Sequence, residues 1–257
     1  MKRQSTILTV TSGKGGVGKS VVAVNLAETL AADHSVALLD ADPGQGACAV
    51  MMNESPPASA VDFVRLDAAA EDVMHETSSD LTLVQSVTEP MWVEHPREND
   101  LLYTALDEIL EALAPSHRYI VIDTPGGLDG PVRWALDRAD LSTLVLVDEP
   151  TAITDAYRLA KLVWRADPEY PLGSIVNYAS SAQDAESVAE RFATITEKFT
   201  GQTPDYLGFI PRSEQIRESV RSQMPVARVP GDVRSSFLDL AHVLQTGRLT
   251  QSTPIHS

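Results

Sequence analysis

VTSGKGGVGKS, residues 10–20, lies between an apolar run and a helical pattern. It contains the phosphate-binding spacing G-x-x-x-x-G-K-[ST] in full, with Gly13, Gly18, Lys19 and Ser20 at the fixed positions. Phosphate oxygens need several inward-pointing backbone N–H groups, and glycine lets a chain curl that tightly because it has no Cβ atom. The spacing therefore predicts a strand, a phosphate-binding loop and a helix, in that order. A glycine-rich turn that matches by chance is the alternative interpretation.

The side chains of this loop suit a nucleoside triphosphate with Mg²⁺. Lys19 can reach the β- and γ-phosphates as a point charge, and Ser20 can offer its hydroxyl to the metal ion. The N-terminus of the following helix adds a partial positive charge. The candidate nucleotide-binding residues of the loop are Gly13, Lys14, Gly15, Gly16, Val17, Gly18, Lys19, Ser20 and Val21.

Lys14 is a second lysine, placed directly after the first glycine of the loop. The backbone amides occupy the phosphate side of the loop, so we expect this side chain to reach outward. An outward cation suits a second nucleotide in a facing subunit, where it can neutralise transition-state charge as an arginine finger does. The spacing alone establishes only a surplus lysine.

The pattern K-G-G-x-G-K-[ST] resembles the deviant Walker A motif of the MinD/ParA family of dimerising ATPases. This resemblance implies a P-loop ATPase fold, ATP and Mg²⁺ as cofactors, and a homodimer that forms on ATP binding. It also implies that Lys14 acts across the dimer, as a catalytic residue alongside Lys19 of the same loop.

Two acids follow a short apolar run at residues 35–39, which predicts a strand buried on both faces of a parallel sheet. Asp40 and Asp42 would then lie at the carboxyl edge of the sheet, where open α/β sheets hold ligands. Two acids that cap the next turn are the alternative. The sequence pattern D-x-D-P-x-x-G resembles the family's second nucleotide motif, which implies that Asp42 orients the attacking water and that Asp40 supports the metal. Ala47 departs from the asparagine common in the MinD branch.

A second strand, at residues 119–122, ends in an acid and the flexible segment DTPGGLDG. This is the Walker B arrangement, in which Asp123 holds Mg²⁺ mostly through water. Gly126 and Gly127 leave the backbone free to change course with the γ-phosphate, which makes this segment a candidate switch. A strand end with an ordinary turn is the alternative. The candidate metal ligands are Ser20, Asp40 and Asp123.

Three further residues are candidates for nucleotide contacts. The wording E-P-T-A-I-T-D-A-Y resembles the flagellar FlhG/FleN branch of the family, and Glu149 matches a glutamate that those relatives direct at the partner's nucleotide, although Asp148 stands where they usually have proline. Asn177 ends an apolar run, and its amide can both donate to and accept from the adenine edge; a turn former is the alternative. Pro211 matches the start of a family loop that packs against the base.

Composition sets limits on location and partners. The net charge is −16, from 20 basic and 36 acidic side chains, so the bulk surface repels DNA and anionic lipid. Cys48 is a single cysteine, which excludes a disulfide within the chain. The opening MKRQSTILTV leads straight into a strand, and no apolar run approaches the roughly 20 residues of a membrane span. We expect a cytoplasmic protein whose membrane contact is weak, peripheral at the inner membrane, or absent.

Alternating strand-like and helical patterns predict an α/β fold, a doubly wound and mostly parallel sheet with helices on both faces. We expect one domain at residues 1–246 and a polar tail at 247–257. The expected strands also cover residues 81–84, 141–147, 174–177 and 206–210. The expected helices cover residues 19–32, 101–113, 182–199, 213–221 and 235–246, a weak helix or two within 60–76, and a helix that begins near residue 151.

The resemblance implies an ATPase switch with slow hydrolysis, in which a partner protein reads the ATP-bound dimer. For the flagellar branch, that partner is a flagellar GTPase, a transcription factor or a basal-body protein, and the output is flagellar number or placement. Three alternatives stay open: a ParA-type partitioning ATPase, which the acidic charge disfavours, a MinD-type division-site regulator, and a regulatory binding protein with negligible hydrolysis.

Overall fold

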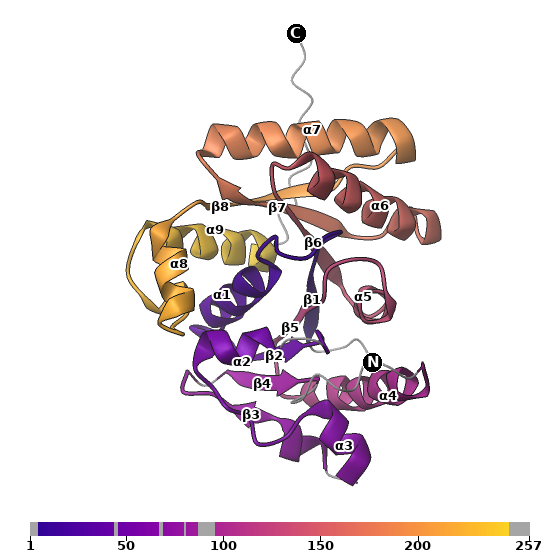
Figure 1. Cartoon of the computed structure of the whole chain (residues 1–257), viewed down its shortest axis with the longest axis vertical. Coiled ribbons are helices and arrows are strands. Elements are labelled where there is room, and N and C mark those ends of the chain that lie inside the picture. Colours follow the sequence, from indigo (N-terminus) through magenta and orange to yellow (C-terminus); the bar gives the residue numbers. More distant parts are fainter. Residues whose placement is uncertain (1–4, 44–45, 67–68, 80, 87–95, 247–257) are drawn as a thin grey trace.

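The computed structural model describes residues 5–43, 46–66, 69–79, 81–86 and 96–246. Its centre is an eight-stranded sheet with the order β3-β4-β2-β5-β1-β6-β7-β8 (Figure 1). All neighbouring strands are parallel except the short β3, which pairs antiparallel with β4. The strands are β1 Thr6–Thr11, β2 Val36–Asp40, β3 His75–Glu76, β4 Thr82–Gln85, β5 Tyr119–Asp123, β6 Leu141–Leu146, β7 Leu172–Ala179 and β8 Asp205–Pro211.

Helices cover both faces of the sheet (Figure 1). One face packs on α1, α2 and α9, and the other packs on α3 to α7. The helices are α1 Lys19–Ala31, α2 Ala47–Met52, α3 Ala60–Leu66, α4 Pro96–Leu113, α5 Gly130–Leu136, α6 Pro150–Ala166, α7 Ala182–Thr200, α8 Glu214–Arg221 and α9 Asp232–Thr246. Short 3₁₀ turns cover Ala70–Val73 and Val226–Arg228. The predicted doubly wound, mostly parallel fold is confirmed.

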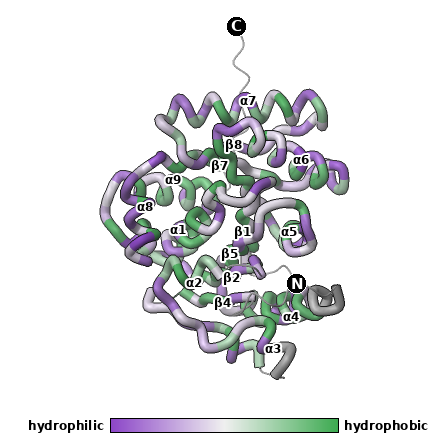
Figure 2. Tube along the Cα trace, in the orientation of Figure 1, coloured by the Kyte–Doolittle hydropathy of each residue, from purple (hydrophilic) through white to green (hydrophobic). Residues whose placement is uncertain are grey.

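The central strands are apolar on both sides because both sides are covered. Val36 and Leu38 of β2 join the core under α1, while Ala37 and Leu39 join the core under α4, as the two-residue period of a strand requires. Figure 2 shows that these strands are mostly hydrophobic, whereas hydrophobic and hydrophilic residues alternate along α7. The buried residues of α7 lie on one face of the helix. Because both faces of the sheet are covered, functional side chains are expected at the ends of its strands.

Most of the expected elements are present within a residue or two, but several differ. α4 begins five residues before the expected helix at 101–113, and α9 begins three residues before the expected helix at 235–246. Residues 60–76 contain α3 and a 3₁₀ turn, then the antiparallel strand β3 in place of a helical end. The short helices α2 and α5, which follow β2 and β5 in the sequence, lie in segments to which no helix was assigned. β7 continues two residues past Asn177 to Ala179, so Asn177 lies within the strand and not at its end.

The strand register brings the predicted acids together. Asp40 of β2 lies directly opposite Asp123 of β5, and Asp123 lies opposite Val10 at the end of β1. The loop that follows β1 therefore begins beside both acids. No helix among the described segments is long and apolar enough to cross a membrane. The predicted tail at 247–257 lies outside the described residues.

Candidate nucleotide-binding site

The glycine-rich loop has the geometry that phosphate binding needs. Gly16 and Gly18 have positive φ angles of 79° and 89°, which side-chain-bearing residues rarely adopt. Gly18 is the N-cap of α1, and no side chain caps that helix end. The first amides of α1 are thus left for another acceptor, and a helix N-terminus in this state favours an anion.

The loop is held from two sides by backbone packed against its glycines. A Cβ atom on Gly13 would lie 2.1 Å from the backbone carbonyl carbon of Asp155 in α6. A Cβ atom on Gly126, in the segment after β5, would lie 2.5 Å from the backbone nitrogen of Gly15. The Gly127 amide also donates to the Ser12 carbonyl at 3.0 Å. The candidate switch segment is therefore in direct contact with the loop.

Gly13→Ala is expected to destabilise the nucleotide-free protein by about 3 kcal/mol, because backbone must move to admit the new methyl group. A thermal melt should show a drop of several degrees. Gly15→Ala is the matched control, because a Cβ atom there meets nothing within 4 Å and its melting temperature should stay within about 1 °C. Equal melting temperatures for the two variants would contradict the packing described above.

Asp40 and Asp123 form a buried carboxylate pair, each at most 1% exposed. Asp40 accepts hydrogen bonds from the backbone amides of Asp42 and Cys48, both at 3.1 Å. The Cys48 thiol donates to Asp123 Oδ2 at 3.5 Å, while Asp123 Oδ1 is buried without a hydrogen-bond partner among the described residues. Burial raises the pKa of Asp40 to about 6, and burial together with the Asp40 charge raises the pKa of Asp123 to about 8.

This pair fits a divalent cation. The unpartnered Asp123 oxygen and the high pKa values both indicate carboxylates without enough positive charge around them. Ser20 lies near enough to Asp123 to lower the pKa of that carboxyl. Ser20, Asp40 and Asp123 supply the hard oxygen ligands that Mg²⁺ prefers. Burial raises the pKa of the Cys48 thiol well above its ordinary value, so the sulfur stays protonated and does not compete for the ion.

Raising the pH is expected to destabilise the metal-free, nucleotide-free protein. An acid with a raised folded-state pKa leaves the folded state with more bound protons than the unfolded state, so stability falls as the pH rises. The window runs from the ordinary value of 3.8 to about 6 for Asp40 and to about 8 for Asp123.

Thermal melts in EDTA should therefore show a fall of about 5 °C between pH 5 and pH 8.5 beyond that of Asp123→Asn, which carries no titrating group at this position. Mg²⁺ at pH 8.5 should recover the loss in the unmodified protein, because the cation balances both carboxylates. Identical pH profiles for the two proteins would contradict the assignment.

Lys19 and Asp42 complete the phosphate side of the site. Lys19 is only 7% exposed, and burial lowers the pKa of its amine. The negative charges of Asp123 and Asp42 act in the opposite direction and raise this pKa. Asp42 is half-buried, and its charge acts on Lys19. The site therefore contains the buried amine of Lys19 and three carboxyl groups, which lie at or just after the ends of β2 and β5.

Lys14 lies on the outer side of the loop, as its position predicts, but it has a partner in its own chain. Its Nζ donates to Glu149 Oε2 at 3.0 Å and to Thr151 Oγ1 at 3.3 Å. The side chains of Lys14 and Glu149 are 41% and 60% exposed. Glu149 is the N-cap of α6, and the neighbouring Asp148 pairs with Arg191 of α7 at 2.5 Å. The fold therefore brings two predicted site residues together that lie far apart in the sequence.

Asn177 and Pro211 lie on neighbouring strands. Asn177 is 2% exposed; its Nδ2 donates to the Val17 carbonyl at 2.8 Å, and its Oδ1 accepts from the Tyr178 amide at 2.9 Å. In this structure the amide supports the loop, and its contact with adenine stays a prediction. Pro211 ends β8 and is half-buried.

Two residues at the site carried no motif in the sequence. Cys48 contacts the carboxylate pair, and only its place next to the D-x-D-P segment hinted at this. Tyr178 has a positive φ of 60°, is 42% exposed, and its hydroxyl lies beside Gly18. A positive φ at a residue with a large side chain is uncommon, and it often marks a functional position. Tyr178 is a further candidate for contact with the base.

Comparisons with known proteins agree with this geometry. Residues 8–226 match the family described as the CobQ/CobB/MinD/ParA nucleotide binding domain. The antiactivator FleN of Pseudomonas aeruginosa is 32% identical over 223 residues, which cover 86% of this chain and 78% of FleN. The flagellum site-determining protein YlxH of Helicobacter pylori is 27% identical over 256 residues, which cover 96% of this chain and 86% of YlxH.

Among solved structures, the septum site-determining protein MinD from Pyrococcus horikoshii, complexed with Mg-ADP, superposes with a TM-score of 0.76. The two proteins are 21% identical, and the match covers 96% of this chain and 99% of MinD. At that identity the superposition establishes the fold alone.

Proposed function

Because the chain belongs to the CobQ/CobB/MinD/ParA nucleotide-binding family, we propose that it is a dimerising molecular switch that controls the number or placement of flagella. It is an ATPase that uses ATP and Mg²⁺. In the proposed cycle, two ATP-bound subunits close face to face, a partner protein reads the dimer, and slow hydrolysis releases it. The flagellar output is inferred from the similarity to FleN and YlxH.

The position of Lys14 is the observation that supports dimerisation most directly. Its amine lies outside the phosphate loop and is held by an exposed ion pair with Glu149 and a hydrogen bond to Thr151 Oγ1. Ion pairs this exposed contribute about 1 kcal/mol or less, so moving the amine to a facing nucleotide costs little. Gly15 and Gly16 beside it are exposed as well. This arrangement favours a site that a second subunit completes.

Each residue then has a role in the proposed reaction. The loop amides and Lys19 bind the phosphates, and Lys14 from the facing subunit neutralises charge that develops during transfer. Ser20 and Asp123, supported by Asp40, hold Mg²⁺, which screens the phosphate charge when bound. Asp42 orients the attacking water.

A ParA-type partitioning role is the second candidate within the family. The net charge of −16 opposes binding to DNA, which carries a dense negative charge. A division-site role stays open on the similarity to MinD. A binding protein with negligible hydrolysis differs from all of these in having no measurable turnover.

One set of experiments separates these functions. Sizing chromatography with a non-hydrolysable ATP analogue should show a dimer, and with ADP a monomer. Deletion of the gene should change the number or position of flagella in electron micrographs, and the Lys14→Ala variant should not restore them. Normal flagella together with lost chromosomes or displaced septa would overturn the flagellar assignment. A monomer in both nucleotide states would overturn the switch.

A further inference from the structure

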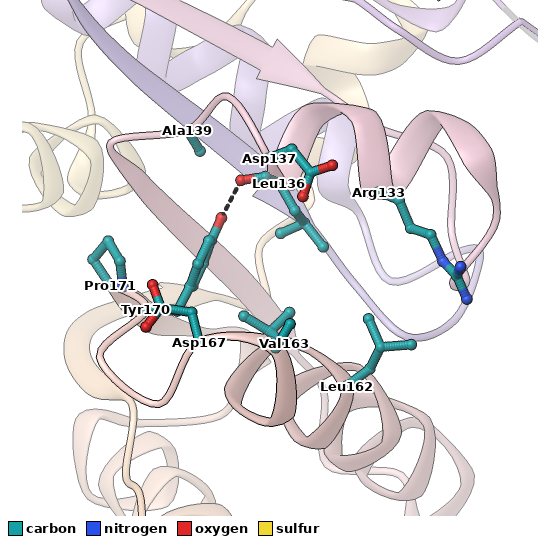
Figure 3. Close-up of a pocket in the computed structure, with 10 residues that line it drawn as sticks. Arg133, Leu136, Asp137, Ala139, Leu162, Val163, Asp167, Tyr170 and Pro171 are labelled. Carbon is teal, nitrogen blue, oxygen red and sulfur yellow. Dashed lines mark hydrogen bonds between the residues drawn. The ribbon is translucent and has the colours of Figure 1, made fainter. Parts of the chain in front are cut away.

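A cavity of about 630 Å³ lies between α5 and α6, at the opposite edge of the sheet from the phosphate loop (Figure 3). Its walls are the C-terminal halves of these two helices, and the segments that lead into β6 and β7 close its side. The volume falls in the range of sites that hold small molecules or peptide side chains, which is about 300–1,000 Å³. None of the residues assigned to the nucleotide site lines it.

The cavity is half open to solvent, and its lining combines apolar side chains with polar surface. Figure 3 shows Leu136 of α5 facing Leu162 and Val163 of α6, with Tyr170 and Pro171 at the side. The Tyr170 hydroxyl is already engaged, because it donates to the Leu136 carbonyl at 2.7 Å and meets the Ser142 hydroxyl at 2.6 Å. Tyr170 therefore offers an occupant the face of its ring and not its hydroxyl.

Two acids bring negative charge to the rim of the cavity. Asp137 is the C-cap of α5 and Asp167 is the C-cap of α6, and both side chains line the cavity. A helix C-terminus carries partial negative charge, so an acid there is the less stable choice. Neither acid forms an ion pair with any residue that the structure describes. Burial raises the pKa of Tyr170 to about 12, and the charges of Asp137 and Asp167 add to this rise.

A cation on the occupant would remove this unfavourable arrangement. The acids and the two helix ends would face it from opposite walls, while the apolar side chains of the lining would receive a neighbouring hydrophobic group. Arg133 also lines the cavity, in the last turn of α5, but its Nε donates to the Leu128 carbonyl at 3.2 Å, and Figure 3 shows its guanidinium turned away from Asp137. In the part of the chain that the structure describes, Arg133 forms no ion pair with Asp137 or Asp167.

Both walls of the cavity lead to the nucleotide site. α5 begins directly after the switch segment that packs on Gly15. The Arg133 Nε of α5 donates a hydrogen bond to the Leu128 carbonyl of that segment. α6 begins directly after Glu149, the partner of Lys14, and Leu162 is 12 residues along it, about 18 Å away. A group that moves the C-terminal ends of these helices apart would also act on both nucleotide-facing ends.

We propose that this cavity is a docking site for a basic segment of a partner protein, which inserts a leucine or aromatic side chain between α5 and α6 and sets a lysine or arginine against Asp137 and Asp167. Binding there is coupled to the nucleotide site through the two helices. The cavity shares no lining residue with the nucleotide site, and the proposal does not rest on the flagellar assignment.

The probe is a display library of random decapeptides, selected on the immobilised full-length protein. Counter-selection uses two variants: Asp137→Asn with Asp167→Asn, which keeps the shape and removes the charge, and Ala166→Phe, which adds bulk to a lining residue. Enriched peptides should carry a basic residue next to a leucine or aromatic residue. Each variant should weaken their binding at least tenfold in fluorescence anisotropy. Glu108→Gln with Glu111→Gln, two exposed acids on α4, is the charge-matched control and should change it less than twofold.

Three results would overturn the proposal. The first is no enrichment, or enriched peptides that bind all four proteins alike. The second is full displacement of the peptide by a simple diamine at equal concentration, which would make the site one for small cations. The third concerns coupling: a bound peptide should change the affinity for a fluorescent ATP analogue at least threefold, and the analogue should change the peptide's affinity by the same factor. An unchanged affinity would remove the link to the nucleotide site.

Discussion

Lys14→Ala lowers ATP turnover by about 10³-fold and leaves ATP binding nearly unchanged, if the amine acts across a dimer as proposed. A cation supplied by a facing subunit is worth about that much or more in related phosphoryl-transfer reactions. Binding is expected to survive because Lys19 and the loop amides, and not Lys14, are the groups proposed to contact the nucleotide of the same subunit. The ion pair with Glu149 is exposed, so its loss should alter the melting temperature by no more than about 2 °C.

The measurement is steady-state phosphate release, with affinity for a fluorescent ATP analogue determined in parallel. Lys161→Ala is the control, because Lys161 is another cation at the surface of α6 that packs over the Tyr157 ring, remote from Lys14. Its turnover should match that of the unmodified protein. Full turnover in Lys14→Ala would remove this residue from the mechanism. A parallel loss of binding would instead assign Lys14 to its own nucleotide.

Asp42→Ala should produce an ATP-bound dimer that persists, with turnover lowered by at least about 10²-fold. The carboxyl group is expected to orient the attacking water, so its removal blocks hydrolysis and leaves phosphate binding intact. Loss of a negative charge beside Lys19 should also tighten ATP binding, because in the unmodified protein Asp42 competes with the phosphates for that amine.

Sizing chromatography after incubation with ATP and Mg²⁺ should show this dimer for Asp42→Ala and a mixture for the unmodified protein. Asp33→Ala, an exposed acid just past the end of α1, should behave like the unmodified protein. A monomer, or a dimer that turns over at the normal rate, would contradict the role given to Asp42. Asp123→Ala should differ from both, because loss of a metal ligand lowers ATP affinity itself.

The phosphate loop and the parallel sheet were predictable from the sequence because their signals are local. Four fixed positions within eight residues specify a loop that only glycine can form, and continuous apolar runs specify strands buried on both faces. The acids at strand ends were predictable for the same reason, since parallel strands deliver their last residues to one edge. The short helices α2 and α5 were not, because six or seven residues give too little periodicity to separate them from loops.

What the sequence determined by itself is the chemistry at the carboxyl edge: one amine, one hydroxyl and three acids around a glycine loop. Only the tertiary structure decided how those groups meet. It set Asp40 directly opposite Asp123, placed Cys48 against them, paired Lys14 with Glu149 and bonded Asn177 to the loop backbone. It also brought the ends of α5 and α6 together around a cavity. These contacts join residues up to 160 positions apart, and pairings at that distance depend on strand order and register, which short-range patterns do not encode.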